Sequence, residues 1–231
     1  MRILAIDTAL PAVSACVLDS GESEPLARES APMERGHAEA LLPLITRVVG
    51  AVDGGFGSID RVAVTVGPGS FTGIRIGLSA AQGIALARKI ELVGVSTLAA
   101  LAAPHILEPF EDVVAAAIDA RNGQVFIAAY GPDGRGVLAP RRMGAHEALR
   151  ALGDGPLRLV GSGAALLEPQ ARASGVAARI VDTAVAPNIA FVARLGLVAN
   201  PADAPARPFY LKAPDAKPLE RQGAEAATLP A

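Results

Sequence analysis

The sequence has little of what several classes of protein depend on. A single cysteine, Cys16, excludes an intramolecular disulfide and a cysteine-rich metal site. Tryptophan is absent and aromatic residues make up 3% of the chain, so the stacking platforms of single-stranded RNA readers are hard to assemble. Gly, Pro or charged residues interrupt every apolar run before about 18 residues, the minimum for a membrane span. We therefore expect a cytoplasmic protein that does not associate with membranes.

What the chain does contain is enough apolar material for a large core. Hydrophobic residues make up 51% of the 231 residues and charged residues 19%, which suits one large or two small globular domains. The net charge is −2, and no basic run is longer than Arg141-Arg142. Proteins that grip nucleic acid by themselves usually carry a basic patch. If RNA is involved, we expect another protein to hold most of it.

The most informative stretch is GPGSFTGIRIGLSAAQGIALA at residues 67–87. A β-branched apolar run at residues 61–66 predicts a buried strand before it. Gly67 and Gly69 then predict a turn, and the hydroxyls of Ser70 and Thr72 predict a helix start. This arrangement suits either an anion site, where free N–H groups converge, or only a tight strand-to-helix connection. The stretch lacks the Lys-Ser/Thr ending of a P-loop and the full GxGxxG spacing.

The helix predicted after this turn is apolar on two sides. A helix of this kind is covered on both sides, so a second helix layer, in this chain or in a partner, is expected besides its own sheet. Its polar stripe is narrow and includes Arg75 and Gln82. The first apolar side contains Ile74, Leu78, Ala81 and Ala85, and the second contains Ile76, Ala80, Gly83 and Ala87.

The two halves of the chain begin alike. AIDT at residues 5–8 and AIDA at residues 117–120 each end an apolar strand in Asp, and Arg121-Asn-Gly supplies a hairpin turn in the second half. Singly, Asp7 and Asp119 read as caps of strand-end turns. Repeated at equivalent places, they favour a shared architecture of two related α/β domains. A second glycine turn, with Gly161 and Gly163, leads into a helix of the second half.

This arrangement resembles the actin/sugar-kinase/Hsp70-like (ASKHA, ribonuclease H-like) superfamily. The resemblance implies two actin-like domains with mixed sheets flanked by helices, and a cleft where strand-end Asp residues and hairpin turns flank ATP phosphates and metal. We expect an N-terminal domain at residues 1–105, a C-terminal domain at residues 106–216 and a disordered tail at residues 217–231. The expected cleft and glycine-turn residues are Asp7, Thr8, Gly67, Gly69, Ser70, Thr72, Asp119, Arg121, Gly161 and Gly163.

The whole set of motifs resembles the TsaB (YeaZ-like) family. They are MRILAIDTA, HAEALLPLI, GPGSFTGIRIG, VGVSTLAAL, AAIDARNGQVFIAAY and PFYLK. The resemblance implies a non-catalytic partner of TsaD in making threonylcarbamoyladenosine next to the anticodon of certain tRNAs. It also implies a TsaE-type ATPase that joins the pair, a homodimer or monomer when the chain is alone, and contact with tRNA only through the complex. Whether a nucleotide occupies the cleft or the complex interface stays open.

One motif of the catalytic relative is absent. TsaD carries an HxxxH metal motif after a GV-containing strand, and the matching positions here are Thr97 and Leu101, neither of which binds metal as imidazole does. The chain's histidines, His37, His105 and His146, have no paired spacing. We therefore expect neither a metal site nor catalysis of threonylcarbamoyl transfer.

The resemblance also implies a partner surface. In the family, the two leading helices of the first domain, here about residues 37–52 and 72–87, pack against equivalent helices of TsaD or of a second copy. On that basis Ile74→Asp or Leu78→Asp would leave the monomer folded and abolish partner binding. The expected interface residues are His37, Leu41, Leu42, Ile45, Ile74, Arg75, Leu78 and Gln82.

Two other functions compete with this one. The repeated Asp residues and glycine turns would suit an ATP-dependent phosphotransferase or ATPase of the same superfamily. However, Thr8-Ala-Leu10 lacks the phosphate-gripping glycines of working kinases, and no general base is evident. A peptidase is weaker still, since no Ser/His/Asp or Cys/His arrangement is legible.

Overall fold

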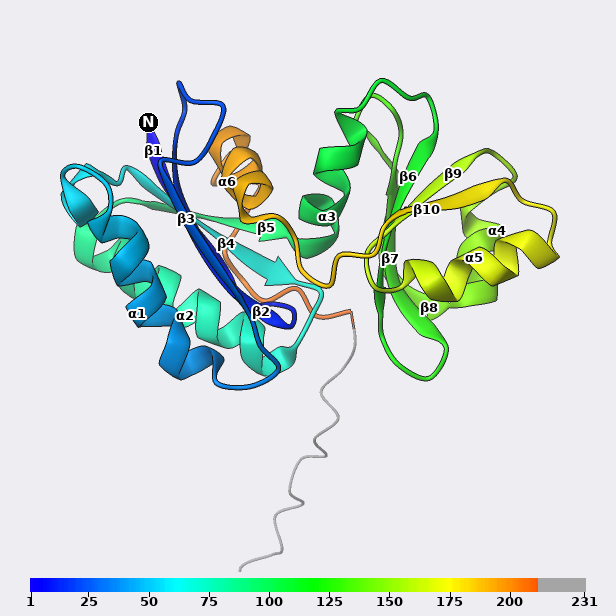
Figure 1. Ribbon diagram of the computed structural model, residues 1–231, viewed down its shortest axis with the longest axis horizontal. Coiled ribbons are helices and arrows are strands. Elements are labelled where there is room, and N and C mark those ends of the chain that lie inside the picture. Colours follow the sequence, from blue (N-terminus) through cyan, green and yellow to red (C-terminus); the bar gives the residue numbers. More distant parts are fainter. Residues whose placement is uncertain (212–231) are drawn as a thin grey trace, which may run out of the picture.

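The computed structural model describes residues 1–211, so the tail expected at residues 217–231 lies outside it. These residues form two five-stranded sheets, one from each half of the chain (Figure 1). The first sheet contains β1 (Arg2–Asp7), β2 (Ala12–Asp19), β3 (Ala27–Pro32), β4 (Arg61–Gly67) and β5 (Glu91–Ser96). The second contains β6 (Val113–Asp119), β7 (Gln124–Tyr130), β8 (Gly136–Gly144), β9 (Leu157–Val160) and β10 (Ala178–Asp182).

The two sheets have the same topology. The strand order is β3-β2-β1-β4-β5 in the first and β8-β7-β6-β9-β10 in the second. In each, the first three strands in sequence pair antiparallel, and the remaining two join in parallel. This identity confirms the predicted α/β class, with two related halves whose mixed sheets are flanked by helices.

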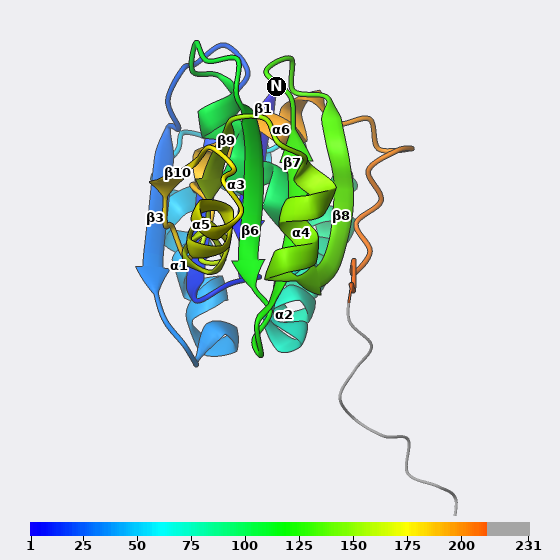
Figure 2. The ribbon, with the colours of Figure 1, turned by 90° about the vertical axis from the view of Figure 1, so that its right-hand side faces the viewer.

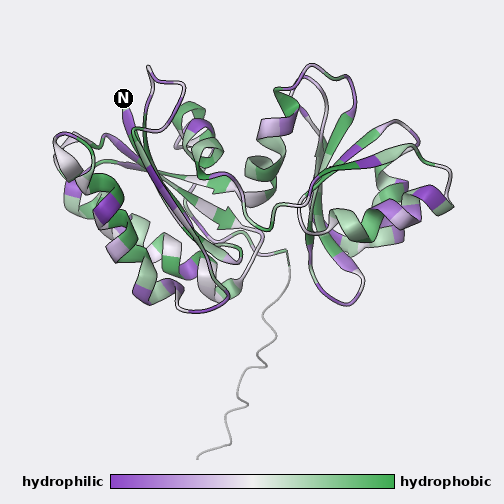
Figure 3. Ribbon diagram, viewed as in Figure 1, coloured by the Kyte–Doolittle hydropathy of each residue, from purple (hydrophilic) through white to green (hydrophobic). Residues whose placement is uncertain are grey.

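Helices and sheets alternate across the molecule (Figures 1 and 2). Helices α1 (His37–Gly50) and α2 (Phe71–Arg88) cover the outer face of the first sheet, and a 3-10 turn, η1 (Gly55–Ser58), follows α1. Helices α4 (Ala145–Leu152) and α5 (Ala164–Ala173) cover the outer face of the second. Between the sheets lie α3 (Thr97–Ile106) and α6 (Ile189–Val198). Hydrophilic positions lie on the outer helices α1, α4 and α5 (Figure 3).

The two central helices are exchanged between the halves. Helix α3 precedes the second sheet in sequence, yet it packs on β6 and β7, while α6 follows the second sheet and packs on β1, β2 and β4. In α6 the side chains of Ile189 and Val192 are buried with Ile3 and Cys16 of the first sheet. The predicted boundary at residues 105/106 falls between the two sets of strands, and each of the two central helices packs mainly on the sheet of the other half.

Two contacts hold α6 close to the first sheet. A Cβ atom at Gly196 would lie 2.4 Å from Cβ of Ala63 and 2.8 Å from Cδ1 of Ile3, so only glycine fits there without displacing the sheet. At the end of the helix, Nη1 of Arg61 donates hydrogen bonds to the carbonyl oxygens of Gly196, Leu197 and Ala199, at 3.1 to 3.2 Å. These carbonyls have no partner within the helix, so a cation from β4 stabilises the helix end.

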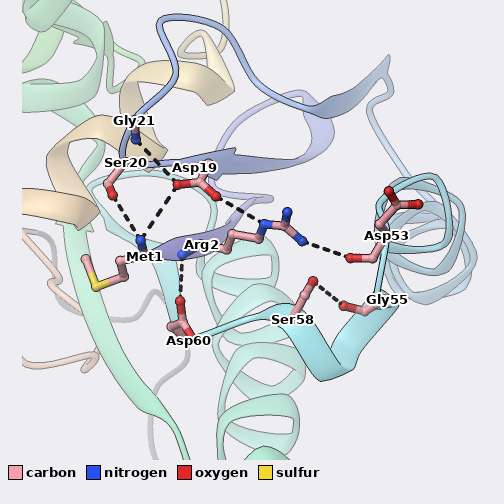
Figure 4. Close-up of polar contacts among 9 residues, drawn as sticks. All are labelled: Met1, Arg2, Asp19, Ser20, Gly21, Asp53, Gly55, Ser58 and Asp60. Atoms are coloured by element: carbon pink, nitrogen blue, oxygen red, sulfur yellow. Dashed lines mark hydrogen bonds and ion pairs between the residues drawn. The ribbon is translucent and has the colours of Figure 1, made fainter.

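The amino end of the first sheet is closed by polar contacts (Figure 4). The backbone N–H of Arg2 donates to Oδ2 of Asp60 at 2.8 Å, its Nε donates to Asp19 at 3.1 Å, and its Nη1 donates to the carbonyl oxygen of Asp53 at 2.8 Å. Burial is higher at the other end of β1, where Asp7 is fully buried. Ligands of open α/β sheets bind outside the carboxyl ends of the strands, so a functional site is expected at this end of the sheet.

One strand differs from the sequence-based prediction. Strand β8 was not expected, because its segment contains Pro140 and two arginines and its side chains alternate poorly between apolar and polar. The polar segment at residues 19–36 was expected to be a hairpin continuation or a loop, and it contains β3, which continues the first hairpin. Within residues 1–211, no helix is long and apolar enough to cross a bilayer.

The close approach at Gly196 makes a direct prediction. Gly196→Ala is expected to lower the free energy of unfolding by about 1–3 kcal/mol, because the added methyl group overpacks the contact with β1 and β4. The matched control is Gly83→Ala in α2, where the new Cβ meets no atom within 4 Å. That variant is expected to be more stable by up to about 1 kcal/mol. Urea unfolding measures both, and a Gly196→Ala protein as stable as Gly83→Ala would contradict this packing.

Candidate functional site

Three glycines, one in the turn before α2 and two in α2 itself, contact the loop that joins β1 to β2. Gly69, Gly73 and Gly77 follow one another at intervals of four and so lie on one face of the helix. Cβ atoms at these positions would lie 2.2 Å from the carbonyl oxygen of Ala9, 2.1 Å from that of Thr8 and 2.5 Å from Oγ1 of Thr8. The loop therefore packs directly against the helix backbone.

The polar groups at this contact bond to each other. Oγ1 of Thr8 donates to the carbonyl oxygen of Gly73 at 2.7 Å, and the N–H of Ser70 donates to the carbonyl oxygen of Ala9 at 2.7 Å. Oγ of Ser70 accepts from the N–H of Gly73 at 3.2 Å, which confirms the predicted helix cap. Since the chain itself fills this space, the tight strand-to-helix connection is favoured over an anion site.

The second half repeats this arrangement. The N–H of Gly163 donates to the carbonyl oxygen of Ala117 at 2.9 Å, and a Cβ atom at Gly161 would lie 2.4 Å from the same oxygen. Oδ1 of Asp7 accepts from the N–H of Ala9, and Oδ1 of Asp119 accepts from the N–H of Arg121 in the equivalent turn. Both aspartates thus stabilise strand-end turns, while the first glycine turn packs on the loop after β1 and the second packs on β6.

The two aspartates differ in exposure. Asp119 is partly exposed, whereas the side chain of Asp7 is fully buried. Oδ1 of Asp7 also accepts from Oγ1 of Thr65 at 2.5 Å, and Oδ2 has no hydrogen-bond partner among the described residues. Burial raises the pKa of the Asp7 carboxyl, against the lowering effect of the hydrogen bonds from Thr65 and Ala9.

A cleft of about 690 Å³ lies between the two halves at these turns. Of the residues expected in it, Gly69, Ser70, Asp119 and Arg121 line its wall. The other six lie behind that wall or outside it, and Thr72 faces a different groove. Those six are Asp7, Thr8, Gly67, Thr72, Gly161 and Gly163.

The rest of the cleft wall is mostly apolar, and its residues were not predicted from the sequence. Four of the chain's eight aromatic residues (six Phe and two Tyr) line it: Phe71, Phe126, Phe209 and Tyr210. The last two belong to residues 204–211, here called the C-terminal strap, which crosses the carboxyl ends of β4 and β5. Within the strap, the N–H of Phe209 donates to the carbonyl oxygen of Val66 at 2.8 Å. The carbonyl oxygen of Ala204, also in the strap, accepts from the N–H of Gly94 at 2.9 Å.

A second concavity of about 600 Å³ lies on the outer surface between α1 and α2, here called the α1–α2 groove. Leu42 and Phe71 in its wall are 56% and 38% exposed, and Leu86 further along α2 is 81% exposed. On the second apolar side of α2, Gly83 and Ala87 are exposed and Ile76 and Ala80 are half-buried within residues 1–211. The groove is lined by Ala38, Leu41, Leu42, Phe71, Thr72, Arg75, Ile76, Ser79 and Ala80.

The structure divides the expected interface residues between core and surface. Ile45, Ile74 and Leu78 are buried in the chain's own core, and so is Leu41, which also lines the groove. Leu42, Arg75 and Gln82 are exposed, and Nε2 of His37 lies 3.3 Å from the carbonyl oxygen of Leu10. The proposed Ile74→Asp and Leu78→Asp tests therefore address the wrong face of α2, since each would bury a charge in the core.

The comparisons with known proteins match proteins described as TsaD, TsaB and YeaZ. A family model described as TsaD, tRNA N6-adenosine threonylcarbamoyltransferase, matches residues 31–139. The Escherichia coli tRNA threonylcarbamoyladenosine biosynthesis protein TsaB is 39% identical over 137 residues, 59% of this chain and 58% of that protein. The structure of YeaZ from Pseudomonas aeruginosa has a TM-score of 0.74 at 27% identity, covering 91% of this chain and 99% of that one. The chain belongs to the TsaB (YeaZ-like) family.

The extent of the match differs among relatives of this TsaB-family chain. An uncharacterized protein of Mycobacterium tuberculosis is 34% identical over 219 residues, 94% of each chain. The alignments to the TsaB proteins of Escherichia coli and Haemophilus influenzae span about half of those relatives' length, 58% and 52%. The part shared with them is thus smaller than the part shared with the solved YeaZ structure.

The positions that match the TsaD histidines lie in the core of this TsaB-family chain. Thr97 is fully buried in the first turn of α3, and Leu101 is 3% exposed. His105, one turn later, lies 3.3 Å from Glu108 and 3.3 Å from Asp182. No group of three or more His, Cys, Asp or Glu side chains placed to hold a metal occurs within residues 1–211.

The burial of Asp7 predicts an unusual pH dependence. A carboxyl whose folded-state pKa is raised contributes stability that is fully present below its unfolded pKa, near 3.8, and is lost as the pH rises through the folded-state value. Asp7→Asn keeps the acceptor oxygen for Thr65 and Ala9 but removes the buried charge. The unfolding free energy of the wild type is therefore expected to fall relative to that of Asp7→Asn as the pH rises from about 4 to about 8. Urea unfolding across this range measures the difference, and a constant difference would contradict the raised pKa.

Proposed function

We propose that this chain is a non-catalytic subunit that binds and activates a TsaD-type transferase. The transferase would place the threonylcarbamoyl group on the adenosine next to the anticodon of its tRNA substrates, in the cytoplasm. Family membership supports the pathway, because the named relatives are tRNA threonylcarbamoyladenosine biosynthesis proteins. The match to the TsaD family model over residues 31–139 supports a partner that is itself related in sequence.

The observation that carries the binding role is the α1–α2 groove. Exposed apolar side chains gather there on two neighbouring helices, and an exposed apolar patch of this kind marks an interaction site. The first apolar side of α2 is already covered by the first sheet, so the second side is the one that a partner helix layer would cover. A second copy of this chain would compete for the same surface, which gives a homodimer when the transferase is missing.

Two observations support a role without catalysis. The glycine turn that would hold a phosphate is filled by Thr8 and Ala9, which disfavours the phosphotransferase alternative. The two positions that match the TsaD metal ligands carry Thr97 and Leu101, both buried. We infer that the partner catalyses the reaction and that this chain contributes by binding the partner.

The other members of the complex follow from the same proposal. A net charge of −2 and few aromatic residues suit contact with tRNA through the complex rather than through this chain alone. A TsaE-type ATPase would join the pair, and any nucleotide would bind at the complex interface or at the cleft between the halves.

The proposal is tested at an exposed groove residue. Leu42→Asp is expected to weaken binding to the TsaD-type protein of the same cell by about 30-fold or more, because it places a charge at the centre of an apolar interface. The isolated variant stays folded, since Leu42 is 56% exposed. Sedimentation of the mixed proteins measures binding, and tRNA modification by the mixture measures activity.

The matched control is Val198→Asp. Val198 is 82% exposed at the end of α6, on the opposite face of the first sheet from α1 and α2 (Figure 1). It is expected to bind and activate like the wild type. Equal binding by the two variants, or modification by the isolated chain, would overturn the proposed role.

A further inference from the structure

Arg75 is held in one orientation at the edge of the α1–α2 groove. Its guanidinium carbon lies 3.8 Å from the ring centre of Phe71, one helical turn earlier, and its Nε donates to the hydroxyl of Tyr210 at 3.1 Å. The rings of Phe71 and Tyr210 stack with their centres 5.0 Å apart. An unrestrained arginine loses about 2 kcal/mol of rotamer entropy when it binds, so holding it beforehand favours binding.

Glycines in β4 and β5 let the C-terminal strap, which carries Tyr210, pack closely on these strands. A Cβ atom at Gly67 would lie 2.7 Å from the carbonyl oxygen of Phe209, and one at Gly94 would lie 2.6 Å from that of Pro205. With the two backbone hydrogen bonds to β4 and β5, these contacts fix the strap beside the first turn of α2. The orientation of Arg75 thus depends on a segment about 135 residues away in sequence.

The residues that line the α1–α2 groove carry positive charge only. Arg75 is the one charged residue among the residues that line the groove, and its neighbours there, Leu42, Ile76 and Ala80, are apolar. The hydrogen bond to Tyr210 uses Nε, so within residues 1–211 the two terminal nitrogens of Arg75 are not engaged by a hydrogen bond. A guanidinium presents such nitrogens to a carboxylate in a bidentate pair.

We propose that Arg75 is the charged anchor of the α1–α2 groove. The occupant is a helix of the partner protein that lays apolar side chains between α1 and α2 and presents an Asp or Glu carboxylate to Arg75. Tyr210 is the positioning residue that aims the guanidinium. This inference rests on the proposed function, because it names the chemistry of the partner at the same groove.

The test compares full-length variants for binding to the TsaD-type protein. Arg75→Gln is expected to weaken binding by about 10- to 100-fold, because a partner carboxylate would be left buried without its cation. Wild-type affinity is expected to fall between about 0.05 M and about 0.5 M NaCl, and the Arg75→Gln variant to lose most of this salt dependence. Arg75→Lys keeps the charge but not the bidentate geometry, so it is expected to recover only part of the affinity.

The role of Tyr210 is tested by a double-mutant cycle. Tyr210→Phe keeps the ring stack on Phe71 and removes the oxygen that accepts from Arg75, and it is expected to weaken binding by about 3- to 10-fold. The double variant, Arg75→Gln with Tyr210→Phe, is expected to bind no more weakly than Arg75→Gln alone. Additive losses would show that Tyr210 acts independently of Arg75 and would overturn its positioning role.

The Leu42→Asp variant separates the two proposals. If it abolishes binding while Arg75→Gln binds like the wild type at both salt concentrations, the groove is the partner surface and the anchor is wrong. If neither variant weakens binding, the partner surface itself is wrong. If Arg75→Gln changes only the self-association of the isolated chain, the carboxylate belongs to a second copy, which overturns the assignment to a partner helix.

Discussion

The contact between the glycine face of α2 and the loop after β1 fixes the geometry of the first half. Gly69, Gly73 and Gly77 let the backbone of Thr8 and Ala9 approach the helix to a distance that no side chain would allow. That approach sets which face of α2 points inward, and so which apolar side chains stay on the surface. It also fills the position at which a helix start would otherwise receive an anion. One packing contact thus favours a binding role over phosphate chemistry.

Much of the fold could be predicted from the sequence because its signals are local. The repeated strand-end Asp, the Asn-Gly turn and the glycine turns predicted two related halves, and the identical strand orders confirm this. Strand β8 was missed because its exposed edge position needs no apolar alternation. The positions of α3 and α6 were missed because a mostly apolar helix fits either sheet, and only tertiary packing decides between them.

The residues of the site were predicted less well than the fold. Hydrophobic periodicity showed two apolar sides on α2 but could not tell the core side from the exposed side, so Ile74 and Leu78 were placed on the surface. The glycine spacing held the missing signal, since a backbone can approach only where side chains are small. Tyr210 could not be linked to Arg75 from the sequence, because their contact depends on the path of the whole chain.

The exchange of α3 and α6 determines how the chain can be divided. A fragment that ends near residue 105 would carry α3 without the second sheet that buries it. The same fragment would lack α6, so Ile3, Ala63 and Val93 on the inner face of the first sheet would be exposed to water. The half that carries the α1–α2 groove is therefore not a separable module. We expect the two halves to fold as one cooperative unit, so that an insertion or truncation at either crossing affects both sheets.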